Sequence, residues 1–160
     1  DIRSDQSERY VGFDCKDLAV GGYRAIGGNA TYGIMEHVIA QTHDRGNWGR
    51  LYFDGQGNIR KESTGEIVEI PIGTGENEVH IGDILFLDLK NDGFYEHTTI
   101  LYEDRSSLNN TTPNNQLGVE DRIIYGMHRS NGTFDCGVLR NFLEDYRKKW
   151  SDLRFIIKHW

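Results

Sequence analysis

Hydrophobic residues recur at helical spacing early in the chain. Starting at Cys15, apolar side chains return at positions i+3, i+4 and i+8, as far as Tyr23, which is typical of one face of an amphipathic helix. Asp14 stands directly before this face and can act as an N-cap that accepts the first free N–H groups. We therefore predict a helix that begins at Cys15 and ends near the glycine pair at 21–22 or that at 27–28.

Two further segments show an apolar helical face. The segment 32–42 follows Asn29 and Thr31, either of which can open a helix, and the segment 138–150 lies close to the end of the sequence. Both are predicted to be helices that pack on the rest of the fold through one side only.

The remaining pattern is that of strands. Short alternating or continuous apolar runs predict strands over 51–53, 59–61, 66–72, 82–89, 97–102, 122–128 and 153–157. A turn rich in Gly, Asp and Asn joins the first two, which is typical of a β-hairpin. The nearly continuous run 82–89 is expected to be a buried central strand beside 97–102, with Asp83 fixing the turn before it. The segment 106–120 is polar and is expected to be a loop.

The order of these elements indicates the fold class. Helices come first, and a meander of antiparallel strands with one late helix follows, which is an α+β arrangement. We find neither an internal repeat nor a linker, so residues 1–160 are expected to form a single domain. In this domain, N-terminal helices pack on a central antiparallel sheet.

Charge and composition exclude several classes of function. The 25 acidic residues outnumber the 18 basic ones, whereas a nucleic-acid-binding protein normally carries a basic stripe. No apolar run approaches the ~20 residues that span a bilayer. Two cysteines cannot build a disulfide framework or a cysteine-based zinc site. No signal peptide is visible before the first helix, and the sequence begins at Asp1 without methionine, so we expect a leader to be absent from this chain.

Cys15 is the first candidate for chemistry, because it stands at the predicted start of a helix. Free N–H groups and the positive end of the helix dipole lower the pKa of a thiol at such a position, and the thiolate is the reactive form. The plain alternative is an inert buried thiol, which is the usual state of free cysteine. Position alone leaves both interpretations open.

A nucleophilic cysteine needs a base and a group that orients the base. His97 opens one predicted strand and His128 closes the next. Neighbouring antiparallel strands can set two such ends close together. The two histidines are therefore candidates for these roles, although each taken alone is more simply a surface or structural histidine.

The other candidate residues are expected to be structural. His37 and His43 are six residues apart, which is not one helical face, so they do not predict a zinc pair. His80 stands before a turn and His159 stands near the end of the sequence. Cys136 follows an aspartate before the last predicted helix, and we interpret it as a structural thiol.

Several segments, in their order along the chain, resemble the motifs of NlpC-type cysteine peptidases. The matching segments are Tyr-x-Gly-Phe-Asp-Cys at 10–15, Gly-Asp-Ile-Leu-Phe-Leu at 82–87, Glu-His-Thr-Thr-Ile-Leu at 96–101, Tyr-Gly-Met-His-Arg-Ser at 125–130 and Arg-Phe-Ile-Ile-Lys at 154–158. Gly-Asp before an apolar strand is common, so the specificity lies in the ordered set, which runs from Tyr10 to Trp160.

This resemblance implies a papain-like fold and a Cys-His-His site. It assigns the nucleophile to Cys15, the base to His97 and the orienting group to His128. Tyr10 and Asp14, just before the nucleophile, are implied to lie on the oxyanion and substrate-binding side. The backbone N–H of the nucleophile is a further oxyanion donor, and such donors typically contribute ~3 kcal/mol each.

The sequence departs from the family pattern at three positions near these motifs. Lys16 and Asp17 replace the usual Ser-Gly after the cysteine, and Thr99 stands where glycine is common. Lys16 favours the thiolate and Asp17 opposes it. The chain therefore resembles a divergent branch of the family.

The implied function is hydrolysis of an amide bond by a cysteine nucleophile, in peptide or isopeptide bonds of bacterial cell-wall peptide stems. The expected partner is a peptide or peptidoglycan substrate, and the expected location is secreted, periplasmic or in the cell envelope. We assign no metal and no cofactor, since neither a metal-ligand cluster nor a phosphate-binding loop is evident. The oligomeric state is left open.

Two alternatives accompany this reading. A cysteine acyltransferase, such as a transglutaminase-like enzyme, uses the same cysteine and histidine but normally an aspartate in third place. A non-catalytic binding module would present the Asn-rich loop 108–116 together with Trp48, Tyr52 and Phe53. For these aromatic side chains, packing in the core is the favoured interpretation.

Overall fold

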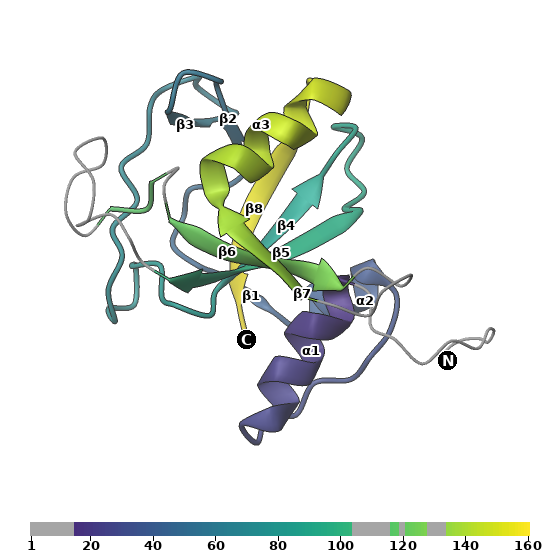
Figure 1. The fold of residues 1–160 in the computed structure, drawn as a ribbon. Coiled ribbons are helices and arrows are strands. Elements are labelled where there is room, and N and C mark those ends of the chain that lie inside the picture. Colours follow the sequence, from purple (N-terminus) through teal and green to yellow (C-terminus); the bar gives the residue numbers. More distant parts are fainter. Residues whose placement is uncertain (1–14, 104–115, 119–120, 128–133) are drawn as a thin grey trace.

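A computed structural model describes residues 15–103, 116–118, 121–127 and 134–160 of the chain. The helices of these residues are α1 (Cys15–Ala25), α2 (Met35–Ala40) and α3 (Leu139–Lys149). The strands are β1 (His43–Asp44), β2 (Leu51–Phe53), β3 (Ile59–Lys61), β4 (Ile84–Asp88), β5 (His97–Glu103), β6 (Arg122–Met127), β7 (Phe134–Val138) and β8 (Arg154–His159). Figure 1 shows their arrangement.

The strands of the described residues form one sheet in the order β3-β2-β8-β4-β5-β6-β7, with β1 beside β8 outside this path. Every pairing between these strands is antiparallel. β4 lies between β8 and β5, and all five of its residues are buried. The α+β class and the central position of β4 are therefore confirmed.

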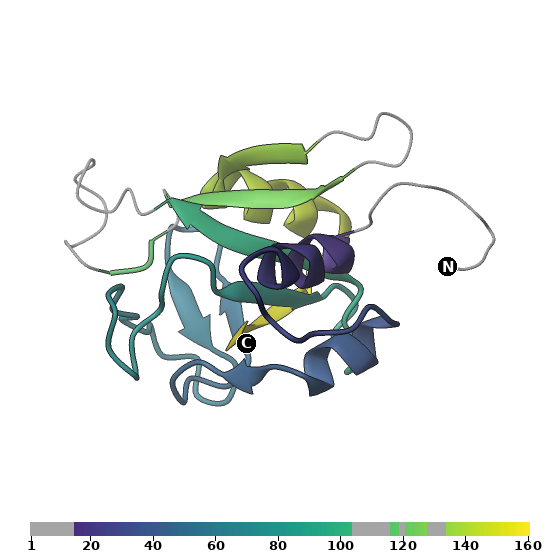
Figure 2. The ribbon, with the colours of Figure 1, turned by 90° about the horizontal axis from the view of Figure 1, so that it is seen from below.

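The sheet carries a separate apolar cluster on each face. Successive side chains of a strand point to opposite faces, so Leu85 and Leu87 of β4 lie in a cluster that α3 covers. Ile84 and Phe86 lie in the other cluster, together with buried residues of α1 and α2. In Figure 1, α3 and α1 accordingly lie on opposite sides of β5 and β6. Figure 2, viewed from below, has α1 in front of the strands and α3 behind β6 and β7.

α1 begins and ends close to where the sequence predicts. Its buried residues, Ala19 and Val20, pack on the sheet. Gly27 adopts a φ of 94°, a conformation in which glycine is much less strained than other residues, and the N–H of Gly28 donates to the carbonyl of Tyr23 over 2.8 Å. The second glycine pair therefore ends the helix.

Most of the other predicted elements are also confirmed. The hairpin of β2 and β3, the strands β5, β6 and β8, and the helix α3 lie within a few residues of their predicted bounds. The helix predicted over 32–42 is shorter, because it begins only at Met35, after Ile34, whose side chain gives no cap.

The strand predicted over 66–72 is wrong. This segment makes only isolated bridges, among them Arg60 with Ile67 and Ile72 with Val79. Its apolar side chains Ile70 and Ile72 are nevertheless buried. Ile67 is exposed, so the apolar pattern reported burial only in part. The segment bonds to β3 at a single bridge, which is too short a pairing for a continuous ladder. The short β1 and the strand β7 were not predicted.

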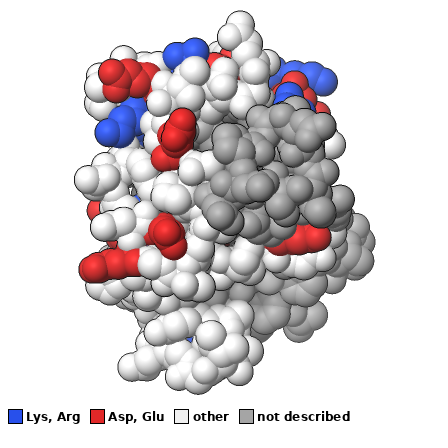
Figure 3. All heavy atoms as spheres, turned by 90° about the vertical axis from the view of Figure 1, so that its left-hand side faces the viewer, with Lys and Arg blue, Asp and Glu red and all other residues white. Residues whose placement is uncertain are grey.

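Helix length and surface charge can be followed in the part of the chain that the structure describes. None of the described helices has the length and apolar character needed to cross a membrane. On the face drawn in Figure 3, scattered acidic groups and isolated basic groups lie among uncharged atoms, and the described residues there form no continuous basic surface.

Candidate functional site

Cys15 is the first residue of α1 and is half-buried, on a helix that packs against β5 and β6. The first turn of a helix has free N–H groups that favour a thiolate. Asp17 places a negative charge in the same turn. The local setting thus combines one feature that activates a thiol with one that opposes its ionisation.

His97 is the first residue of β5 and lies opposite Leu87 of β4. Its ring stacks on two rings of α3, with centroid distances of 5.8 Å to Phe142 and 5.3 Å to Tyr146. The Nε2 atom of His97 is buried. The imidazole therefore lies on the face of the sheet that α3 covers.

The structure brings α1, which carries Cys15, into contact with β5, which carries His97, but the ring of His97 points to the other face of the sheet. Ala19 lies one helical turn after Cys15 and is buried in the cluster on the α1 face. The ring of His97 packs against α3 on the other face. Cys15 and His97 thus belong to neighbouring elements, α1 and β5, that lie in contact, while the imidazole is turned toward α3.

The other predicted site residues lie outside the described part of the chain. These are His128, which follows the last residue of β6, and Tyr10 and Asp14, which precede α1. The proposed orienting group and the proposed oxyanion side therefore have no described position.

The Gly-Asp pair before β4 has a structural role. Gly82 has a φ of 100°, and its N–H donates to the carbonyl of Leu101. Asp83 accepts the N–H of His80 over 2.9 Å and forms a two-pronged ion pair with Arg45, at 2.7 and 3.1 Å. The prediction that Asp83 fixes a turn is confirmed.

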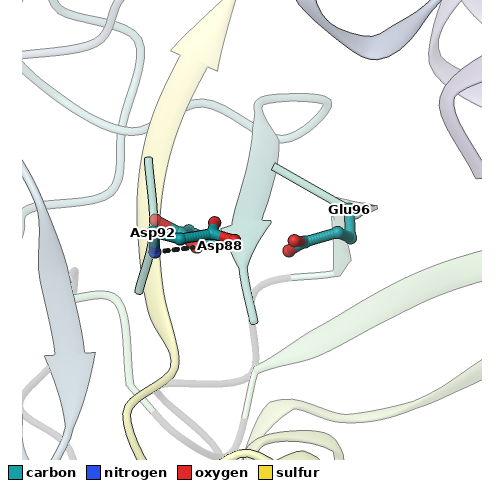
Figure 4. A group of neighbouring side chains, drawn as sticks. All are labelled: Asp88, Asp92 and Glu96. Atoms are coloured by element: carbon teal, nitrogen blue, oxygen red, sulfur yellow. Dashed lines mark hydrogen bonds between the residues drawn. The ribbon is translucent and has the colours of Figure 1, made fainter. Parts of the chain in front are cut away.

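An acidic group at the other end of β4 has the residue types of a metal site. Oxygens of Asp88, Asp92 and Glu96 lie within 4.8 Å of one another, and Figure 4 shows the three side chains converging on the loop after β4. Asp88 is fully buried and accepts the N–H groups of Asp92 and Gly93, at 3.1 and 2.8 Å. Glu96 accepts the N–H of Leu89. These bonds close the loop.

An arginine already supplies positive charge to this acidic group. Nη1 of Arg50 donates to Asp88 over 2.9 Å and to the hydroxyl of Tyr95 over 3.1 Å, and the guanidinium also contacts Glu62. Burial by itself raises the pKa of Asp88, but hydrogen bonds from Gly93, Arg50 and Asp92 outweigh it and hold the pKa below its ordinary value. The cluster therefore works as a protein-internal network, and we do not assign a cation to it.

The histidines expected to be structural differ in their surroundings. The ring Nε2 of His80 lies 2.7 Å from the carbonyl of Gly75, inside its own loop. His37 is exposed on α2. His43 and His159 lie opposite each other on β1 and β8. Cys136 is exposed and belongs to β7, a strand that the sequence did not predict.

The aromatic residues of the binding-module alternative pack within the protein. Phe53 is buried in the cluster beneath α3, and Trp48 packs against the same cluster. The ring of Tyr52 lies under the guanidinium of Arg154, at 4.5 Å. The core interpretation is therefore confirmed for Phe53 and Trp48, whereas Tyr52 belongs to neither apolar cluster and packs against Arg154 instead. The Asn-rich part of that alternative lies mainly outside the described residues.

Sequence reasoning missed the aromatic pair that receives His97. Phe142 and Tyr146 are four residues apart on α3, with ring centroids 4.3 Å apart. Their spacing placed them on the apolar helix face, but only the packing of α3 over β5 shows which residue they contact.

Comparison with models of protein families, with curated proteins and with solved structures finds no match for this chain.

Proposed function

We propose that the protein is a cysteine hydrolase of amide bonds, with Cys15 as the nucleophile, in a papain-like fold of the NlpC type. The observation that carries the proposal is that Cys15 begins an 11-residue helix packed against β5, the strand that His97 begins. A thiol at a helix start is poised for ionisation, and a histidine on an adjacent element is the usual base for such a thiol.

The assembly of elements around β4 adds support. The motif segments at 82–87, 96–101 and 154–158 are not merely ordered along the sequence; they form or overlap the three adjacent strands β4, β5 and β8. The segment that contains Cys15 supplies the helix on one face of these strands. Segments that resemble one family thus lie together as one structural unit.

In the proposed reaction, His97 takes the thiol proton, and the Cys15 sulfur attacks the carbonyl carbon of the scissile amide. The leaving amine receives that proton, and a thioester remains on the cysteine. Water, deprotonated by the same histidine, then attacks the thioester, so the products are a carboxylate, an amine and the restored thiol. His128 holds the imidazole in one tautomer, as third members of catalytic triads do.

The packing of the His97 ring against α3 is the observation that most strongly opposes this assignment of the base. The reaction needs a ring nitrogen of His97 close to the sulfur, at about 4 Å or less in a loosely arranged site. The decisive experiment must therefore separate two questions: whether Cys15 is activated, and whether His97 activates it.

Alkylation rates of the two cysteines answer both questions separately, with Cys136 as an internal reference. Cys136 is exposed and Cys15 is half-buried, so access alone predicts faster alkylation of Cys136. With limiting iodoacetamide at about pH 6.5, where an ordinary thiol is largely protonated, we expect Cys15 to react at least ~10-fold faster, because an activated thiol is already ionised. Mass spectrometry of tryptic peptides measures both rates in the same sample.

The matched variants are His97→Gln and His37→Gln. Loss of His97 should slow alkylation of Cys15 and leave Cys136 unchanged, whereas loss of the exposed His37 should change neither. If Cys15 reacts more slowly than Cys136 in the wild type, the hydrolase proposal is wrong. If Cys15 is fast in the wild type and equally fast in His97→Gln, the nucleophile stands and the assignment of the base is wrong.

We propose bacterial cell-wall peptide stems as the substrate, and a secreted, periplasmic or cell-envelope location for the protein. Purified peptidoglycan should be digested with the wild type, Cys15→Ala and Cys136→Ala. We expect new peptide fragments from the wild type and Cys136→Ala only, and their masses locate the cleaved bond. Identical fragment profiles for all three proteins contradict the cell-wall substrate.

A further inference from the structure

The edge of the sheet brings together two histidines that are far apart in the sequence. His43 of β1 lies directly opposite His159 of β8 in the antiparallel register. Directly opposed residues on paired strands point to the same face, with Cβ atoms about 4.5–5.5 Å apart. The two imidazole centroids lie 5.7 Å apart, with the ring planes inclined at 43°.

This separation suits two imidazoles that share one metal ion. A Zn–N distance of about 2.0–2.1 Å, extended to the ring centre and opened to a tetrahedral angle, puts the two centroids about 5 Å apart. The observed centroid distance is 5.7 Å, and a small rotation of either side chain is enough to close the difference. The backbone of β1 and β8 therefore needs no rearrangement for both rings to bind the same ion.

A hydrogen bond also prepares one ring for coordination. Nδ1 of His159 lies 2.8 Å from the main-chain oxygen of Trp160, an acceptor, so Nδ1 must carry the proton of the neutral ring. The lone pair then sits on Nε2, the outer nitrogen. A metal-binding histidine typically donates its other N–H to such an oxygen, which fixes the tautomer and raises the basicity of the coordinating nitrogen.

The charges beside the pair are balanced. Asp44 and Lys158, the next opposed residues, form an ion pair at 3.0 Å with each other. His43 is exposed and His159 half-buried, so solvent can complete the coordination sphere. Imidazole ligands suit zinc, nickel and copper, whereas calcium and magnesium prefer oxygen.

We propose that His43 and His159 form a binding site for a late first-row divalent cation such as Zn²⁺, with water in the remaining positions. Both histidines bind through a ring nitrogen, and for His159 this nitrogen is Nε2. The ion links the two-residue strand β1 to β8, so it stabilises the edge of the sheet. The site is separate from Cys15 and does not depend on the proposed hydrolase activity.

Titration of the whole chain with Zn²⁺, followed by NMR of the histidine ring nitrogens, tests the proposal. We expect Nε2 of His159 and one nitrogen of His43 to shift together, while Nδ1 of His159 stays protonated. Residue-resolved signals separate this event from Zn²⁺ binding at Cys136 or any other group. Because metal ions bind only neutral imidazole, lowering the pH should weaken the binding.

Calorimetry on His43→Gln, His159→Gln and the control His37→Gln gives the affinities. Loss of either paired histidine should weaken this binding event at least ~10-fold, since even the outer partners of metal ligands commonly contribute 10–100-fold. The control should bind as the wild type does. Circular dichroism of each variant verifies that it folds.

Shifts confined to one of the two rings, or equal affinities in the wild type and both paired variants, would overturn the proposal. So would an effect of His37→Gln as large as that of either paired variant. Without added Zn²⁺, alkylation of Cys15 should be the same in the wild type and in His159→Gln, which keeps this result distinguishable from the outcome for the hydrolase.

Discussion

The two ends of β4 use the same chemistry in different ways. At its start, the buried Asp83 pairs with Arg45, and at its end the buried Asp88 pairs with Arg50. Both arginines come from the short segment between β1 and β2. Each pair therefore fixes the central strand to a part of the chain that lies about forty residues earlier.

The difference lies in how many partners each arginine has. The side chains of Arg45 and Asp83 are only 9% and 4% exposed, and both guanidinium bonds of the ion pair go to one carboxylate. The side chain of Arg50 is 24% exposed and also contacts Glu62, Tyr95 and Asn91. When Asp83 is lost, Arg45 keeps a long contact of 3.5 Å to the carbonyl of Glu76, whereas Arg50 without Asp88 keeps the side chains of Glu62, Tyr95 and Asn91.

The largest effect is expected from Asp83→Ala. It leaves the Arg45 guanidinium buried without its carboxylate, which typically costs about 3–5 kcal/mol of unfolding free energy. Urea unfolding measures this loss. The double variant Arg45→Met/Asp83→Leu removes both charges and should recover most of the stability, because no unpaired charge remains buried. A double variant that is no more stable than Asp83→Ala contradicts the explanation by an unpaired buried charge.

A smaller loss, about 1.5–3 kcal/mol, is expected for Asp88→Asn. The amide has one oxygen, so it can still accept from Asp92 or from Gly93, which donate to different oxygens of Asp88, and Arg50 retains Glu62 and Asn91. Urea unfolding at neutral pH compares it directly with Asp83→Ala. A loss from Asp88→Asn equal to or above that from Asp83→Ala would show that the shared arginine gives no protection.

Asp88 also makes stability depend on pH. Its pKa in the folded protein lies below the ordinary 3.8, because the hydrogen bonds from Gly93, Arg50 and Asp92 outweigh the effect of burial. The unfolded chain therefore binds the proton more readily, and the contribution of Asp88 is fully present above about pH 4. It is lost as the pH falls from there through the lower folded pKa.

Asp54 also makes stability fall at low pH, because its pKa is lowered in the folded protein. Burial by itself raises this pKa, but the hydrogen bonds from Arg60, Gln56 and Asn58 outweigh it.

Unfolding experiments between about pH 5 and pH 2 should show a shallower loss of stability for Asp88→Asn than for the wild type. Parallel curves for the two proteins would contradict the assignment to Asp88.

Gly82→Ala tests the start of β4 without touching a charge. The φ of 100° at this position is unfavourable for a residue with a Cβ, although space for the Cβ itself is open. We expect a loss of about 1–2 kcal/mol from backbone strain alone. Gly22→Ala, in α1, is the control, since its added Cβ also meets no atom and its φ is not positive; there alanine should raise stability.

The smallest effect is expected at the exposed pair of Asp44 and Lys158. The side chain of Asp44 is 76% exposed, so solvent screens its interaction with Lys158. Asp44→Asn should change the unfolding free energy by less than about 0.5 kcal/mol. A loss comparable to that of Asp88→Asn would show that burial is not what separates the ion pairs of this protein.

The sequence alone determined the elements whose pattern is local. The helix start at Cys15, the hairpin of β2 and β3, and the buried β4 each follow from spacing within one short window. A helical or strand period is visible wherever one face is buried, whatever the partner is. Over 66–72 the pattern reported the burial of Ile70 and Ile72 but not the exposure of Ile67, and its strand is wrong because the segment makes only isolated bridges.

Only the tertiary structure decided which side chains meet across the sheet. The ring of His97 lies against α3 because His97 has the same parity along β5 as Leu101, a residue of the cluster on that face. His43 meets His159 because β1 pairs with β8, and a strand of two residues is too short to leave a recognisable pattern in the sequence. A register shift of one residue would reverse each of these orientations. Register is set by the packing of the whole sheet, so the chemistry that depends on it follows from the fold and not from any single segment.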